Sequence, residues 1–221
     1  MHIPHGFLSP EVAVGGYVVA AAACGAAVWQ ANRTLSEKQV PLLGVMAAFV
    51  FAAQMLNFPI PGATSGHFLG ALMMAVLLGP LLSCLVMAVV LTIQCLAFAD
   101  GGLDALGANI LNMGVFAGAA CYYLFILLRK VLPRTRVGFT VSLAIAAWFS
   151  VVISSALCAV ELWLSGKFAL ALALPVMVGI HSLIGLGEAA ITVAVTMVLV
   201  EARPDLVGGW MVPEGAAVPA K

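Results

Sequence analysis

The sequence predicts an all-α, polytopic membrane helix bundle with seven transmembrane segments, one of which is a short helix. Composition is the first observation behind this prediction. Of the 221 residues, 64% are hydrophobic and only 8% are charged, and the mean hydropathy is +1.17. A soluble domain carries about 25% charged residues. The second observation is that the apolar residues form runs of roughly 20 residues, the length that a helix needs to cross a bilayer.

Five apolar runs have the length of ordinary spans, namely 10–31, 39–56, 104–130, 137–163 and 171–201. The stretch 66–98 is too long for one ordinary span and has Gly79-Pro80 near its middle. Proline has no N–H and disfavours helix in the residue before it. We therefore expect this dipeptide to divide the stretch into a short segment, 66–79, and a full span, 81–98.

The basic residues support this division independently. With seven segments, eight of the nine basic residues lie on one side, Lys167 being the exception; the eight are Arg33, Lys38, Arg129, Lys130, Arg134, Arg136, Arg203 and Lys221. Cytoplasmic loops are enriched in Lys and Arg. The N-terminus is therefore expected outside, together with the loops 57–66 and 99–107, and the C-terminus in the cytoplasm.

Polar residues inside apolar spans are costly and are functional candidates by default. The ionisable ones are His67, at the start of the short segment, and His181 and Glu188, which share one face of the last span. Two interpretations of the last pair stay open, a structural pair or a role in transport or coupling. Further candidates are the amides Asn57, Asn109 and Asn112; for Gln54 and Gln94 we favour hydrogen bonds between helices.

The N-terminal stretch MHIPHG suggests a metal chelate. The free amine of Met1, the backbone nitrogen of His2 and the His2 imidazole can bind one metal together, in a planar array that suits Ni²⁺ or Cu²⁺, with Co²⁺ also plausible. A fourth ligand must come from elsewhere, and His67 is predicted at the same face. The start has neither the basic nor the apolar region of a secretory signal, so these residues are expected in the mature protein, with Met1 retained.

Four blocks together resemble the CbiM/NikM family, the substrate-binding S components of energy-coupling-factor transporters for cobalt and nickel. The blocks are MHIPHGFLSP, NFPIPGATSGHFLGA (57–71), FADGGLDALGANILNMG (98–114) and HSLIGLGEAAIT (181–192). The resemblance implies that the N-terminal segment folds back into the bundle and that Met1, His2 and His67 hold the metal. The usual family start is MHIPDG, so His5 either shapes the turn, which we favour, or offers an axial nitrogen.

The resemblance also implies a set of partners. They are a transmembrane T component (CbiQ type), cytoplasmic ATPase subunits (CbiO type) and a small membrane subunit (CbiN type). The chain has no G-x-x-x-x-G-K-[ST] motif with which to hydrolyse ATP itself. The expected location is the lipid of a bacterial cytoplasmic (inner) membrane. Net charge is zero, and no basic patch favours nucleic acid.

The leading interpretation is a metal-binding domain over residues 1–203, with residues 1–9 as its metal-binding segment and 204–221 as a cytoplasmic tail. It captures Co²⁺ at the outer face for ATP-driven uptake, which supplies cobalamin synthesis. No catalytic residue or catalytic cofactor is expected. Alternatives are the same role for Ni²⁺, an intramembrane metal-dependent hydrolase, and a purely structural subunit. The sequence lacks the HExxH spacing of zinc proteases that would favour the hydrolase. Cobalt is preferred because two blocks, SGHFLGA and GANILNMG, resemble CbiM-type members more closely.

Overall fold

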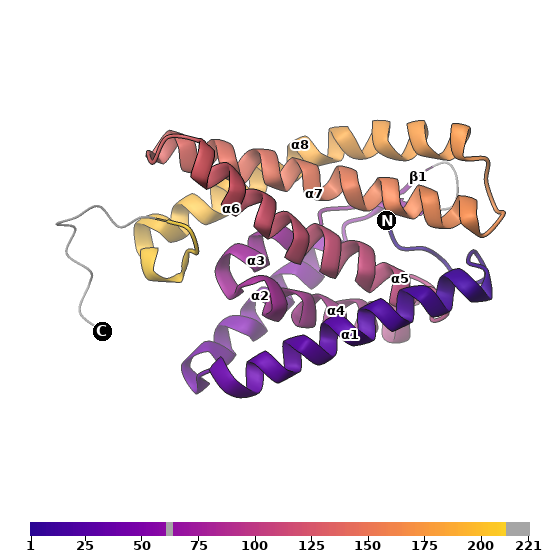
Figure 1. Ribbon diagram of the computed structural model, residues 1–221, viewed down its shortest axis with the longest axis horizontal. Helices are drawn as coiled ribbons and strands as arrows, with labels where there is room; N and C mark the ends of the chain where they lie inside the picture. Colours follow the sequence, from indigo (N-terminus) through magenta and orange to yellow (C-terminus); the bar gives the residue numbers. More distant parts are fainter. Residues whose placement is uncertain (61–63, 211–221) are drawn as a thin grey trace.

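The computed structural model describes residues 1–60 and 64–210 and is a bundle of seven helical segments (Figure 1), which confirms the predicted all-α class. In chain order the segments are α1 (Pro10–Thr34), α2 (Val40–Gln54), α3 (Ala71–Leu78), α4 (Pro80–Phe98), a continuous segment made of α5 (Leu106–Ile110), the π-helical stretch η2 (Leu111–Ala120) and α6 (Cys121–Val131), then α7 (Arg136–Leu164) and α8 (Leu170–Ala202). Single 3₁₀ turns cover Glu37–Gln39 and Pro204–Leu206.

Five of these segments are long and apolar enough to cross a membrane: α1, α4, α5–α6, α7 and α8. The remaining two are shorter, since α2 has 15 residues and α3 has 8. Local sequence explains where the long helices begin. The Ser9 hydroxyl accepts a hydrogen bond from the Val12 N–H and Pro10 occupies the first helical position, both of which favour a helix start. The Thr135 hydroxyl caps α7 in the same way, through Gly138.

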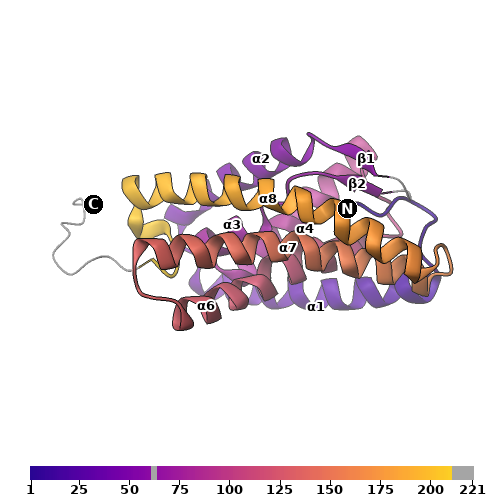
Figure 2. The same ribbon diagram turned by 90° about the horizontal axis from the view of Figure 1, so that it is seen from above.

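Successive segments run in opposite directions, so the connections gather at two ends of the bundle (Figures 1 and 2). One end, called the site end below, holds the N-terminal segment 1–9 and the connections 99–105 and 165–169. The far end holds the connections 35–39, 132–135 and 203–210 and the junction between α3 and α4. The described parts of the two termini therefore lie at opposite ends, as a seven-segment bundle requires. The assignment of the site end to the outer face stays a prediction from the basic residues.

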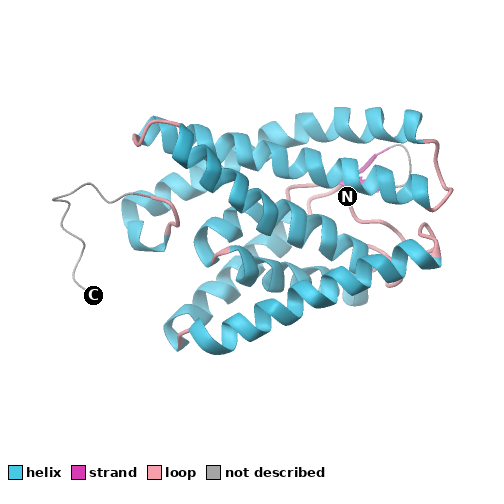
Figure 3. Ribbon diagram, in the orientation of Figure 1, coloured by secondary structure: helices cyan, strands magenta, loops and turns pink. Residues whose placement is uncertain are grey.

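The connection between α2 and α3 differs from the sequence prediction. Its described residues include a short antiparallel hairpin of β1 (Phe58–Ile60) and β2 (Thr64–Gly66), with Ser65 opposite Pro59 (Figure 3). The predicted helical start at residue 66 is wrong, because α3 begins only at Ala71. The physical reason is that β2 runs to Gly66 and that Gly70 adopts a left-handed φ of 70°, which a right-handed helix does not contain. The amides of Leu69 and Gly70 donate instead to the Glu188 carboxylate. The predicted break at Gly79-Pro80 is confirmed, with Gly79 at φ 85°.

Helix α3 fills the centre of the bundle, and residues 71–77 are all buried. At its far end the Gly208 N–H donates to the Val76 carbonyl over 2.8 Å. The Trp210 ring packs edge-on against Phe139, with 5.0 Å between ring centroids. Residues 204–210 of the predicted tail thus pack against the bundle. The rest of that tail, 211–221 with Lys221, lies outside the described residues, as do residues 61–63 of the predicted 57–66 loop.

Candidate metal centre

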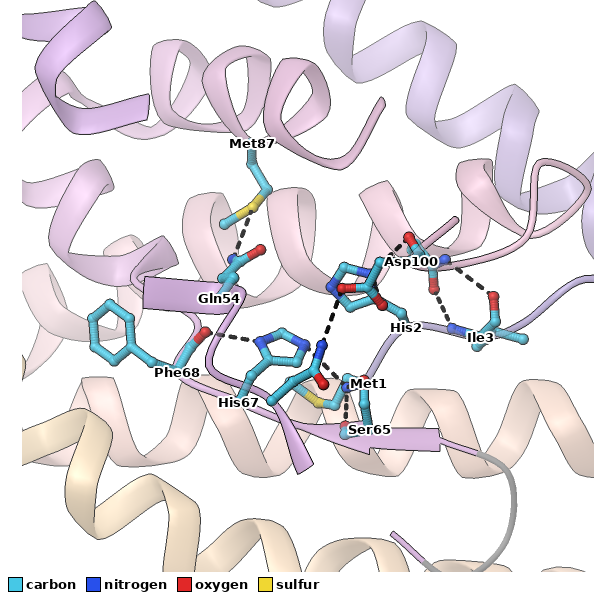
Figure 4. Close-up of polar contacts among 11 residues, drawn as sticks. Met1, His2, Ile3, Gln54, Ser65, His67, Phe68, Met87 and Asp100 are labelled. Carbon is cyan, nitrogen blue, oxygen red and sulfur yellow. Dashed lines mark hydrogen bonds and ion pairs between the residues drawn. The ribbon is translucent and has the colours of Figure 1, made fainter. Parts of the chain in front are cut away.

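The N-terminal segment turns from α1 back into the bundle, where Met1, His2 and Ile3 are all buried (Figure 4). Its backbone is held beside the α4–α5 connection. The Ile3 N–H donates to Asn109 Oδ1 over 2.9 Å, and the Ile3 carbonyl accepts from the Gly102 N–H over 2.8 Å. Residue 102 must be glycine, because a Cβ there would lie 2.4 Å from the backbone nitrogen of His5.

His5 shapes the turn that follows. Its Nδ1 lies 3.0 Å from Asp104 Oδ1, and the Gly6 N–H donates to the other oxygen of the same carboxylate over 2.8 Å. The His5 side chain is 82% exposed, whereas Met1, His2 and His67 are buried. This geometry favours the turn over an axial nitrogen for His5.

The amine of Met1 lies between β2 and His67. It donates to the carbonyl of Ser65, lies 3.3 Å from the Ser65 hydroxyl, and lies 3.1 Å from Nε2 of His67 (Figure 4). The opposite ring nitrogen of His67, Nδ1, is 2.8 Å from the Phe68 carbonyl. A carbonyl accepts only, so Nδ1 carries the proton and Nε2 presents a lone pair to the amine.

The His2 imidazole packs edge-on against that of His67, with 4.7 Å between ring centroids. Its Nδ1 lies 3.1 Å from the Asp100 carbonyl oxygen and 3.3 Å from the Asp100 carboxylate, which also accepts from the Asn57 side-chain amide over 3.3 Å. Among the described residues, His2 Nε2 is buried without a hydrogen-bond partner. Met1, His2 and His67 are thus brought together from residues that lie far apart in the sequence.

Burial keeps these nitrogens unprotonated at neutral pH. Desolvation lowers the pKa of the Met1 amine from 8.0 to about 5. The pKa of His2 is lowered to about 4, chiefly by burial and also by the nearby amine, while Asp100 opposes the shift. A metal ligand must offer a free lone pair. The cluster therefore consists of neutral nitrogens with the lone pairs that a metal would need.

The other predicted candidates have separate partners. Asn109 holds Ile3, whereas the Asn112 amide donates to Glu161 over 2.6 Å, an interhelical contact between η2 and α7. His181 and Glu188 are both buried on α8 but do not share a partner. His181 Nδ1 lies 2.7 Å from its own helix's Met177 carbonyl, and Glu188 accepts from two backbone amides before α3.

Sequence reasoning missed three residues around the site, namely Ser65, Asp100 and Asp104. Both aspartates belong to the loop ADGGLDALG (99–107), which is predicted at the same end of the bundle as MHIPHG. Two carboxylates in one loop opposite two histidines were the available signal. Ser65 acts through its carbonyl, for which residue type gives no signal.

Within residues 1–60 and 64–210, no three His, Cys, Asp or Glu side chains gather as a metal site. The groups that the structure brings together at Met1, His2 and His67 are an amine and two imidazoles.

Fold and site together define a polytopic membrane protein with a buried cluster of nitrogen donors formed by its N-terminus. The chain belongs to the CbiM family of transition-metal transport proteins, because the model of the "cobalt uptake substrate-specific transmembrane region" matches residues 2–206. The resemblance found in the sequence is thereby confirmed. Members of this family transport cobalt or nickel.

The names of similar proteins mention nickel in some cases and cobalt in others. The chain is 41% identical to a putative fused nickel transport protein, NikMN, of Archaeoglobus fulgidus, over 94% of this chain and 68% of that one. It is 36% identical to the cobalt transport protein CbiM of Geobacter sulfurreducens, over 67% of this chain and 44% of the relative. A crystal structure of a truncated transition metal transporter matches with a TM-score of 0.85 at 31% identity, covering 91% of this chain and 99% of the other.

Proposed function

We propose that this protein is the substrate-specificity (S) component of an energy-coupling-factor importer and that it captures Co²⁺ at the outer face of the membrane. The observation that carries the proposal is the 3.1 Å separation between the Met1 amine and His67 Nε2. Two nitrogens bound at about 2 Å and at right angles to one metal lie about 2.8 Å apart. A small adjustment therefore allows both atoms to bind one ion.

The donor set follows from the chemistry of the N-terminus. The amine, the backbone nitrogen and Nδ1 of His2 close a five- and a six-membered ring around one metal, with the backbone nitrogen in the middle. His67 Nε2 occupies the position opposite that nitrogen and therefore next to the amine. Binding requires loss of the His2 amide proton and rotation of Nδ1 away from the Asp100 carbonyl, from which it lies 3.1 Å.

Membrane orientation comes from the basic residues. The far end carries Arg33, Arg129, Arg134, Arg136 and Arg203, whereas the site end carries Lys167. We infer that the far end faces the cytoplasm and that the metal enters at the outer face of a bacterial inner membrane. Residues 1–203 form the metal-binding domain in this assignment, and the chain continues into a cytoplasmic tail.

Partners supply the energy. The sequence has no P-loop motif, so ATP hydrolysis falls to CbiO-type subunits coupled through a CbiQ-type T component. A CbiN-type small subunit is supported by the names of relatives described as fused proteins, NikMN of Rhodobacter capsulatus and LarMN of Lactiplantibacillus plantarum. The names of the relatives support transport rather than the hydrolase alternative.

Cobalt is the proposed ion and nickel the alternative. Intrinsic affinity for nitrogen donors rises from Co²⁺ to Ni²⁺, and named relatives transport one or the other. Uptake of radioactive Co²⁺ by cells that carry the full complex, with Ni²⁺ as competitor, tests this choice. Efficient Co²⁺ uptake that is not reduced by a tenfold excess of Ni²⁺ supports cobalt as the transported ion. Exclusive uptake of Ni²⁺ refutes it.

The capture site is tested by adding one residue before Met1 and measuring metal bound per purified protein. The amine would then lie one residue away from His67, and binding is expected to be lost. One residue added after Lys221 serves as the control and should leave one metal per chain. Full binding by the N-terminally extended protein would refute the site.

A further inference from the structure

A carboxylate outside the proposed donor set holds the segment that carries His67. Glu188 lies in the middle of α8 and is 1% exposed. Its Oε2 accepts from the Leu69 N–H over 2.7 Å, and its Oε1 accepts from the Gly70 N–H over 2.8 Å. An ionisable group is costly inside a membrane bundle. Here both oxygens of the Glu188 carboxylate accept hydrogen bonds from two consecutive backbone amides.

These amides belong to the four-residue connection 67–70 between β2 and α3. The same connection is held from α2, where the Gln54 side-chain amide donates to the Leu69 carbonyl over 2.8 Å. It is also tied internally, because His67 Nδ1 bonds to the Phe68 carbonyl over 2.8 Å. Glu188 therefore fixes the peptide units that in turn fix the orientation of the His67 ring.

We propose that Glu188 is a positioning residue for the metal site: its grip on the Leu69 and Gly70 amides holds His67 Nε2 where it completes the ligand set begun by Met1 and His2. The inference rests on the proposed function, since His67 must be a ligand for its position to matter. It assigns Glu188 a role through His67 rather than a direct contact with the ion.

The consequence is that the two halves of the site are attached to different parts of the bundle. His2 is held by Asp100 of the α4–α5 connection and Ile3 by Asn109, while the Met1 amine also donates to Ser65 of β2. His67 is held by α8 through Glu188. A displacement of α8 relative to α5 would therefore pull His67 away from His2 and reduce the number of nitrogens that can bind the ion at once, which provides a route to release.

A double-mutant cycle tests this role in the purified full-length protein, with Ni²⁺ as the probe of affinity. We expect Glu188→Gln to weaken binding by about 10- to 100-fold, the usual effect of losing a residue that orients a ligand. His67→Ala should weaken binding at least as much, and the double variant no more than His67→Ala alone. Coupling of this kind identifies residues that act through one another.

Glu161→Gln is the matched control, because Glu161 is also a buried carboxylate near the site end but accepts from the Asn112 side chain instead. It should bind Ni²⁺ with wild-type affinity. Cu²⁺ loaded into the Glu188→Gln variant should give an electron paramagnetic resonance spectrum with three coupled nitrogens in place of four. A residue that only stabilises the fold would lower the melting temperature without changing that spectrum.

Glu188→Asp provides a second variant if the glutamine variant does not fold. It keeps the charge but is too short to reach both amides, so the same loss is expected, again only when His67 is present. Wild-type affinity in a folded Glu188 variant, or equal losses with and without His67, would overturn the inference. Failure of the wild-type protein to bind Ni²⁺ or Co²⁺ would instead refute the proposed function.

Discussion

Asn109 bonds to both backbone groups of Ile3. Its Oδ1 accepts from the Ile3 N–H over 2.9 Å and its Nδ2 lies 3.4 Å from the Ile3 carbonyl oxygen. A single side chain in α5 thus fixes the extended N-terminal segment two residues from the amine that faces His67. The position of the Met1 amine depends on this contact, because only His2 lies between Met1 and Ile3.

Replacing Asn109 with leucine should release this segment. We expect Asn109→Leu to weaken Co²⁺ or Ni²⁺ binding by about 10-fold or more, as loss of outer contacts does in metal sites. Isothermal titration of the purified protein measures the effect. Gln94→Leu is the control, because the Gln94 side-chain amide is buried without a partner among the described residues. Equal affinities for the two variants would contradict the role of Asn109.

His67 Nε2 is the proposed fourth nitrogen ligand, and the effect of removing it should be reversible. His67→Gly is expected to weaken metal binding more than the roughly 10- to 100-fold seen for outer contacts. Added imidazole should restore part of the affinity by filling the space left by the side chain. Absorption spectra of the Ni²⁺ form report the number of nitrogens bound. No recovery with imidazole, together with an unchanged spectrum of the variant, would exclude His67 as a ligand.

Metal affinity should depend on pH less steeply in the protein than in a free peptide with the same start. Burial lowers the pKa of the Met1 amine to about 5 and that of His2 to about 4, so both are already unprotonated at pH 7. Between pH 6 and 8 the ion displaces only the His2 amide proton, about one proton per metal. Below pH 5 the amine becomes protonated and binding falls more steeply.

Proton release on Ni²⁺ binding measures this directly, by titration in two buffers of different ionisation enthalpy. The peptide MHIPHG is the comparison, because its exposed amine and imidazole keep ordinary pKa values. It should release more than one proton per metal near pH 7. Release of two protons by the protein at pH 7 would show that the amine is protonated in the folded state.

His5 should be dispensable as a ligand. The ring is exposed and paired with Asp104, so His5→Ala is expected to leave Ni²⁺ affinity within about twofold, since only the turn loses a surface ion pair of small energy. A tenfold loss of affinity in His5→Ala, with a changed metal spectrum, would instead indicate an axial nitrogen.

Much of the architecture could be predicted because long apolar runs identify membrane helices in a sequence. Gly79-Pro80 and the distribution of basic residues were enough to divide 66–98 correctly. The start of α3 could not be predicted, because it depends on Glu188, which lies more than a hundred residues away and takes the amides of Leu69 and Gly70. Sequence patterns describe local periodicity and carry no information about such distant partners.

The proposed ligands were readable for a different reason. The chemistry of an amine followed by a histidine depends on neighbouring atoms in the chain, so Met1 and His2 could be selected without a structure. Of the residues that hold them, Asn57 and Asn109 were polar candidates in the sequence, but their partners could not be predicted. Ser65 and Gly102 contribute backbone groups, and the contacts of Asp100 and Asn57 depend on how distant connections meet at the site end.

Helix α3 has a consequence for how an ion can cross the bundle. Its buried apolar residues, 71–77, lie directly after the connection 67–70 that carries His67. At the far end of the helix, the Gly208 N–H donates to the Val76 carbonyl. An ion driven straight through would lose its hydration shell against this apolar plug, at a cost of many kcal/mol. A protein with such a centre is expected to deliver an ion by changing its position or shape, and not as an open pore.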